Sequence, residues 1–210
     1  MSTAPLDRLL TGDPSIRWQV TDDLLGLPRE CVAAERASVA TEGWGARLLA
    51  EQDPEGSWAG VRLHWERARR FDGGLTLAAT VSEPGMCIAG MPIDLAVAFG
   101  LRDSRVDDAV EWLTAQQLAD GGWNCLVIRR GSGHGSFHTS ITVLEAMAAD
   151  ARLTEAIEEV RRAQRPDGTW PRHRPYPGRY WCTMEAPGPS RWSTLRALRV
   201  LAWWDGRERT

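Results

Sequence analysis

The chain has 210 residues, of which 43% are hydrophobic and 25% are charged, and its formal net charge is −3. This length allows one domain with a substantial core, and the scattered positive charges argue against a nucleic-acid surface or a polybasic membrane patch. No apolar run approaches the ~20 residues that span a bilayer, and residues 1–13 lack the features of a signal peptide. We therefore expect a single cytoplasmic domain over residues 1–210, with no nucleic-acid partner and no transmembrane segment.

Three compositional features narrow the possible chemistry of the protein. All 25 basic residues are Arg, which excludes a lysine Schiff base and with it the usual covalent attachment of pyridoxal phosphate. The four cysteines form no Cys-x-x-Cys pair and are expected to be thiols in a reducing compartment. The 11 tryptophans outnumber the 2 Tyr and 3 Phe, and they suit either the lining of an apolar cavity or a packed core.

The N-terminal region predicts two helices. Asp13 precedes a helix from Pro14 to Leu25, whose apolar residues recur at helical spacing. The Ala-rich stretch from Arg29 to Gln52 predicts one long outer helix, bent near residues 43–45.

The segment that follows is harder to assign. Residues 58–74 are polar and rich in Arg and Gly, which predicts a loop with one helical turn at residues 63–69. Residues 75–81 are short and apolar, a pattern that suits a helix or a strand, and we favour a helix.

The rest of the chain alternates apolar and amphipathic segments. Residues 86–99 and 136–149 are almost uncharged, which predicts buried helices, and 104–118 and 153–164 are amphipathic. Residues 190–204 predict a final apolar helix. Each apolar helix and the amphipathic helix after it are expected to form a hairpin.

One motif occurs three times, at residues 52–58, 117–123 and 164–170. Each copy has Gln, five residues and then Trp, with Gly two positions before the Trp. Each follows an apolar helical run, and an acidic residue with glycine is typical of a tight turn at a helix end. We expect each copy to be a corner that staples successive helices, with the Trp folded back onto the helix end.

The three motifs resemble the QW repeats of squalene and oxidosqualene cyclases and the related turns of protein prenyltransferase β subunits. The resemblance extends over about residues 35–204 and implies an all-α fold, an α/α toroid of helical hairpins. Four inner helices (14–25, 86–99, 136–149 and 190–204) and three to four outer ones are then expected. We favour a ring closed within one chain, with a homodimer as the alternative.

In such toroids the ligand cavity is reached through the N-terminal ends of the inner helices, and this places the candidate site. His138 begins an apolar helix and suits acid or base chemistry near neutral pH, or a structural hydrogen bond to the preceding loop. Glu185, in apolar and aromatic surroundings, is a candidate acid or a charge at a helix N-terminus, and Glu83 is a third catalytic candidate. The candidate substrate-binding residues are Trp18, Cys87, Trp123, Asn124, Cys125, His134, Trp181 and Trp192.

The resemblance also raises zinc as an alternative. Prenyltransferase β subunits hold zinc with Asp, Cys and His, and here the corresponding set would be Cys87, Cys125 and His138. The sequence lacks the Asp that this family places two residues before its Cys, and an isolated Cys is commonly a small buried residue. We therefore expect no cofactor and no metal, with zinc as the alternative. The DxDD acid motif of the cyclases is absent as well.

Two functions follow from these patterns. The first is a terpenoid-cyclase-like enzyme that uses acid/base chemistry for cyclisation, isomerisation or lysis of an apolar or aromatic small molecule in a Trp-lined cavity. The second is a non-catalytic toroid that binds a hydrophobic ligand or a partner. The gathering of titratable residues at helix starts favours the enzyme.

Overall fold

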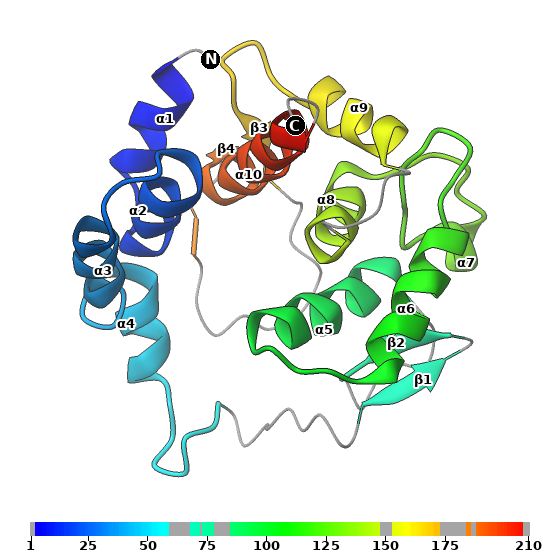
Figure 1. The fold of residues 1–210 in the computed structure, drawn as a ribbon, viewed down its shortest axis with the longest axis horizontal. Coiled ribbons are helices and arrows are strands. Elements are labelled where there is room, and N and C mark those ends of the chain that lie inside the picture. The colour runs from blue at the N-terminus through cyan, green and yellow to red at the C-terminus, as the bar shows by residue number, and fades with distance from the viewer. Residues whose placement is uncertain are drawn as a thin grey trace. The chain divides into compact units, whose positions relative to one another are not determined.

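The computed structural model describes residues 3–58, 68–71, 73–77, 85–147, 153–172, 184–185 and 188–207. These residues are mostly helical, which confirms the all-α prediction (Figure 1). No helix in the described ranges is long and apolar enough to cross a membrane. Contacts divide the chain into two compact units: unit 1 holds residues 1–62 and 164–210, and unit 2 holds residues 63–163. The single domain over residues 1–210 stays a prediction.

Unit 1 joins helices from the two ends of the chain. Its core includes Ile16, Val20 and Leu195, which are shielded from solvent. Asp13 begins the first predicted helix as expected, because its carboxylate accepts a hydrogen bond from Ser15 N at 2.8 Å. The elements are α1 (Thr3–Leu10), α2 (Pro14–Gln19), the π-helical turn η1 (Val20–Leu24), α3 (Arg29–Ser38), α4 (Gly43–Ala50), β3 (Trp170–Pro171), β4 (Pro189–Ser190) and α10 (Arg191–Arg207).

The prediction of one long helix from Arg29 to Gln52 is wrong. The chain forms two helices, α3 and α4, separated by a turn at residues 39–42. Gly43 begins α4 with a φ of +64°, and a Cβ there would collide with the Asp13 carboxylate. Asp13 also accepts a hydrogen bond from Trp44 N at 2.7 Å, so one carboxylate binds the starts of both α2 and α4.

Unit 2 contains two helical hairpins and a small sheet. Its buried residues include Met86, Ile93, Leu113, Ile141 and Ile157. The elements are β1 (Arg69–Phe71), β2 (Gly74–Thr76), α5 (Met86–Ala98), α6 (Ser104–Ala115), α7 (Val127–Arg130), α8 (Phe137–Ala146) and α9 (Thr154–Arg162). The apolar and amphipathic helices predicted for this region are thus confirmed as α5, α6, α8 and α9.

The prediction of a helix over residues 75–81 is wrong for its first two residues, which belong to a strand. Leu75 lies in β2, where it pairs with Arg70 of the antiparallel strand β1 and is 2% exposed. Gly73, with a φ of +96°, forms the turn between the strands. Residues 78–81 lie outside the described residues, as do residues 63–67 of the helical turn predicted at 63–69. The end of that predicted turn is wrong, because Arg69 lies in β1.

Helices α5 and α8 run side by side in the same direction. Near their starts, Cys87 of α5 and Thr139 of α8 both contact Cys125. One turn further on, Gly90 approaches Thr142 so closely that a Cβ at Gly90 would lie 3.1 Å from the Thr142 carbonyl oxygen. The N-terminal ends of these two helices therefore meet around one loop residue.

The three Gln-x5-Trp motifs are helix corners, as predicted, and we call them the first (52–58), second (117–123) and third (164–170) corner. In each, the Gln side-chain amide donates to the carbonyl of the glycine four residues later, at 3.0, 2.7 and 3.2 Å. Each of these glycines has a φ between +77° and +83°. The Gln side chain thus closes the turn.

The tryptophan indole makes the bond to the helix. Trp58 Nε1 donates to Leu48 O and Trp123 Nε1 donates to Leu113 O, both at 2.7 Å and both ten residues back. The backbone N–H groups of Trp123 and Trp170 donate to hydroxyls one turn into the following helices, Ser140 of α8 and Thr194 of α10. The second corner therefore connects the helix before it, α6, to the helix after it, α8, and the third corner is bonded to the helix after it, α10.

Candidate functional site

The best-defined cluster of reactive side chains surrounds Cys125, in the loop after the second corner. Its Sγ accepts hydrogen bonds from the backbone N–H of Cys87 at 3.2 Å and from the Thr139 hydroxyl at 3.7 Å. The Sγ atoms of Cys125 and Cys87 are 2.7 Å apart. Both cysteines are half-buried and carry free thiols. The sequence placed Cys87 in the first turn of a predicted inner helix and Cys125 in the loop before another, and the parallel packing of α5 and α8 brings them together.

The surroundings of the two sulfurs favour different protonation states. The hydrogen bond from the Cys87 thiol lowers the pKa of Cys125 to about 6. The Cys87 backbone N–H and the Thr139 hydroxyl also lower this pKa, whereas burial raises it. The pKa of Cys87 is raised, because its thiol is held against Cys125 and because it is partly buried. These contacts therefore favour the thiolate on Cys125 and the protonated thiol on Cys87.

Only part of the alternative zinc set comes together. Cys87 and Cys125 are adjacent, but no group of three His, Cys, Asp or Glu residues suited to a metal ion occurs among the described residues. His138, the third predicted ligand, is half-buried in the first turn of α8, with its ring edge on Phe137 at a centroid distance of 5.0 Å. The described residues thus offer two of the three ligands that a catalytic zinc requires.

A second polar cluster lies beneath the second corner, and the sequence did not predict it. Asp120 accepts hydrogen bonds from Gly135 N at 2.8 Å and Gly122 N at 3.2 Å. These bonds, the one from Gly135 above all, lower the pKa of Asp120. Glu159 accepts a hydrogen bond from Ser140 Oγ at 2.8 Å, and burial raises its pKa.

Three predicted substrate-binding residues serve the second corner and its loop. Trp123 is fully buried against the helix before it. The Asn124 side-chain amide donates to Ser132 Oγ and to the His134 carbonyl, which closes the loop between the corner and α8. The His134 side chain is 94% exposed, and its Nδ1 lies 3.9 Å from Asp120 Oδ2. These contacts give Trp123 and Asn124 a structural role.

Glu185 caps α10. Its carboxylate accepts hydrogen bonds from Ser190 Oγ at 2.6 Å and from Trp192 N at 3.0 Å. This is the helix N-terminal charge that the sequence offered as the alternative to a catalytic acid. Because His138 belongs to unit 2 and Glu185 to unit 1, a His138–Glu185 pair stays a prediction.

The remaining candidates are in unit 1 or outside the described residues. Trp18 is half-buried, with the Arg36 guanidinium 5.1 Å from its ring centroid, which is a cation–π contact. Trp192 is half-buried in the first turn of α10. Glu83 and Trp181, as well as Cys182, lie outside the described residues.

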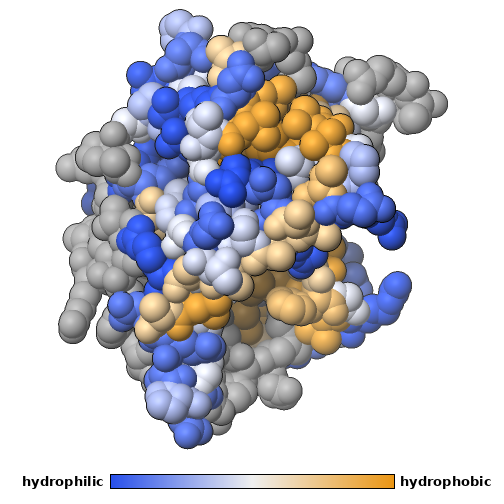
Figure 2. Space-filling view, turned by 90° about the vertical axis from the view of Figure 1, so that its left-hand side faces the viewer, coloured by the Kyte–Doolittle hydropathy of each residue, from blue (hydrophilic) through white to orange (hydrophobic). Residues whose placement is uncertain are grey.

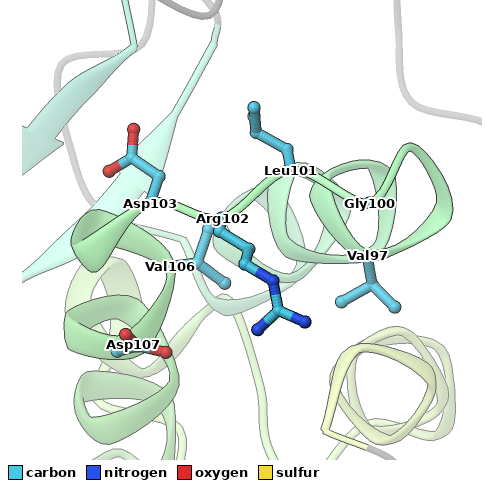
Figure 3. A pocket seen from close by; sticks show the side chains of 7 residues that line it. All are labelled: Val97, Gly100, Leu101, Arg102, Asp103, Val106 and Asp107. Carbon is cyan, nitrogen blue, oxygen red and sulfur yellow. The ribbon is translucent and has the colours of Figure 1, made fainter.

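The described part of each unit contains a surface depression. In unit 1, a cavity of about 320 Å³ is lined by Arg8, Asp13, Trp44, Glu185 and Arg191, among others. In unit 2, a cavity of about 350 Å³ lies at the turn between α5 and α6. Figure 3 shows the Arg102 side chain extending between Val97 and Val106, while Asp103 points away from it. Neither cavity contains Cys125 or His138.

Helix α5 carries an apolar stripe that the fold leaves exposed. Met91 is 59% and Leu95 is 39% exposed, and both lie on the face that starts with Cys87. Met86, Ala89 and Ile93 on the other side are buried. Unit 1 also exposes leucines, for example Leu48 and Leu49 of α4. Figure 2 shows apolar residues at the surface on the side where α3 and α4 lie.

A comparison with protein-family models and one with curated proteins find no match to this chain.

Proposed function

We propose that the chain is a terpenoid-cyclase-like α/α toroid that binds an apolar or aromatic small molecule. In this proposal α5 and α8 are neighbouring inner helices, and α6 and α9 are the outer helices of their hairpins. The parallel course of α5 and α8 supports this assignment, because the inner helices of a toroid share one direction. The three Gln-x5-Trp corners support it as well.

The observation that carries the proposal is the exposed stripe of Met91 and Leu95 on α5. Asp94 is the only charged residue of this helix. Single exposed apolar residues are common on proteins, but a continuous stripe is typical of a ligand or interaction surface. The stripe begins at Cys87, so its polar end meets the start of α8, where His138 lies. An apolar ligand along α5 would thus have polar and titratable groups at one end, the usual composition of a small-molecule site.

A binding experiment tests the ligand class. Farnesol, a linear isoprenoid alcohol, is titrated into the protein and followed by calorimetry. Introducing a charge into an apolar contact is unfavourable, so Met91→Glu should weaken binding at least about tenfold. Val97→Glu is the matched control, because Val97 is on the same helix, 67% exposed and off the stripe. Equal weakening by both variants, or no binding by the parent, would contradict the proposal.

The catalytic part of the proposal rests on His138 as acid or base at the start of α8. Incubation with a panel of isoprenoid alcohols and diphosphates, followed by gas chromatography, measures turnover. His138→Gln should lower turnover by about 10²- to 10⁴-fold and leave farnesol binding intact. The non-catalytic binding protein is the second candidate, and the use of Glu185 as a helix cap favours it. Binding without turnover by the parent would select that candidate.

A further inference from the structure

We propose that Cys87 and Cys125 form a thiol–disulfide exchange site, in which Cys125 attacks small disulfides and Cys87 completes an internal disulfide. The inference is independent of the proposed function, because it depends only on contacts within unit 2. Low-molecular-weight disulfides such as oxidised glutathione are the substrate class.

Proximity is the first argument. The two sulfurs are 2.7 Å apart, and the sulfurs of a disulfide are about 2.04 Å apart. Because the sulfurs are already this close, little movement is needed to join them. Both thiols are free and half-buried, so they are partly open to solvent. The residues are 38 positions apart in the chain, which means that the fold brings them together.

The second argument is the asymmetry of the two environments. Cys125 faces two donors besides the partner thiol: the Cys87 backbone N–H in the first turn of α5 and the Thr139 hydroxyl in the first turn of α8. Donors of this kind stabilise a thiolate, which is the nucleophile of thiol–disulfide exchange. Cys125 is therefore the attacking residue. Cys87, adjacent and protonated, is the resolving residue.

The reaction balances with the small disulfide as the oxidant. The Cys125 thiolate forms a bond to one sulfur of the disulfide, whose S–S bond breaks, and the other half leaves as a thiolate. Cys87 then loses its proton to that thiolate and attacks Cys125 Sγ, which releases the second half of the reagent. Starting from the Cys125 thiolate, the protein loses two electrons and the Cys87 proton, and one small disulfide becomes one small thiol and one small thiolate.

The absence of lysine makes the test direct. Trypsin cleaves this chain only at Arg, and this places Cys31, Cys87, Cys125 and Cys182 on four separate peptides: residues 30–36, 71–102, 106–129 and 180–191. The reduced full-length protein is treated with oxidised glutathione, quenched with N-ethylmaleimide, digested and analysed by mass spectrometry. We expect peptide 71–102 to be linked to peptide 106–129, and dithiothreitol to reverse the link. The same treatment in urea should abolish this preference.

Single variants assign the two roles. Cys87→Ser should accumulate a mixed disulfide with glutathione on peptide 106–129, because the resolving thiol is missing. Cys125→Ser should react at peptide 71–102 at least about fivefold more slowly, and Cys31→Ser, which changes an exposed cysteine, should behave like the parent. If Cys31 forms mixed disulfides while peptides 71–102 and 106–129 stay unlinked, or if all four cysteines link at random, the proposal is wrong. The parent measurement decides this even if a variant does not fold.

Discussion

The first and second corners share two hydrogen bonds but differ in packing. In both, the Gln amide closes the turn and the Trp indole bonds the helix carbonyl ten residues back at 2.7 Å. Trp123, however, is fully buried, whereas Trp58 is partly exposed. The repeated motif therefore determines the turn and the bond to the preceding helix. Burial of the tryptophan depends on what else packs against it.

The surroundings of the second corner explain its tighter packing. Trp123 N donates to Ser140 of α8, and Ser140 donates in turn to Glu159 of α9. A Cβ at Gly121 or Gly122 would collide with Glu155 or Glu159, so α9 lies directly against this turn. At the first corner, a Cβ at Gly56 would have only Gln52 Nε2 nearby, at 3.8 Å. The same seven-residue motif is thus a packed junction in one place and a surface turn in the other.

The largest effect is expected from removing the tryptophans. Trp123→Ala should lower the free energy of unfolding by roughly 3–5 kcal/mol, because it deletes a fully buried aromatic. Trp58→Ala should cost only about 1–2 kcal/mol, because less of its surface is buried. Urea denaturation of both variants measures the difference. Equal costs would mean that the indole hydrogen bond, which the two corners share, is the main contribution.

The corner glycines give a matched pair for the same comparison. Gly121 and Gly56 have similar positive φ values, +83° and +77°, so replacement by Ala should cost each about 1–2 kcal/mol in backbone strain. Gly121→Ala adds a collision with Glu155, which should raise the total to roughly 2–4 kcal/mol. Thermal unfolding of the two variants tests this. A Gly121→Ala variant no less stable than Gly56→Ala would show that α9 moves away without cost.

Removing the Ser140 hydroxyl, which lies between Trp123 and Glu159, should have a smaller effect on the free energy of unfolding. Ser140→Ala leaves the buried Trp123 N–H without this acceptor, which should cost about 1–3 kcal/mol. Ser132→Ala in the neighbouring loop is the control: it removes a hydroxyl that accepts from Asn124 at a half-buried site and should cost less. Chemical denaturation gives both values. A loss confined to Ser132→Ala would contradict the role assigned to Ser140.

The sequence predicted the features that local sequence patterns determine, and it missed those that depend on contacts between residues far apart in the chain. The alternation of apolar and amphipathic segments predicted α5, α6, α8 and α9, and the motif spacing predicted all three corners. The strand β2 was missed because a short apolar run carries no period that separates strand from helix. The break between α3 and α4 depends on the positive φ of Gly43 beside Asp13, which is a contact made only in the fold.

The candidate site shows the same division. Cys87 was placed in the first turn of an inner helix and Cys125 in the loop before another, but their contact requires the parallel packing of α5 and α8. Glu185 was expected near the start of α10, and only the structure shows both carboxylate oxygens in the cap. Asp120 was part of the turn motif, but neither its contacts nor those of Glu159 were predicted, because acidic residues in a turn and on an amphipathic helix are usually solvated.

Glu159 gives the smallest and most specific prediction for the second corner. Burial raises its pKa above the ordinary value of 4.5, and the charge of Asp120 adds to this, whereas the Ser140 hydrogen bond opposes it. The folded state therefore holds the proton more tightly than the unfolded state, so stability falls as the pH rises from the unfolded pKa through the folded one.

Glu159→Gln keeps an acceptor for Ser140 without the charge. It should stabilise the protein by about 0.5 kcal/mol at pH 7 and by nothing below about pH 4, where both side chains are neutral. Its neighbour Glu158, exposed and paired with Arg161 at 2.5 Å, should show the opposite sign or no effect at pH 7 when changed to Gln. Thermal melts of the three proteins at both pH values measure this, and a destabilised Glu159→Gln variant at pH 7 would mean that the charge stabilises the corner.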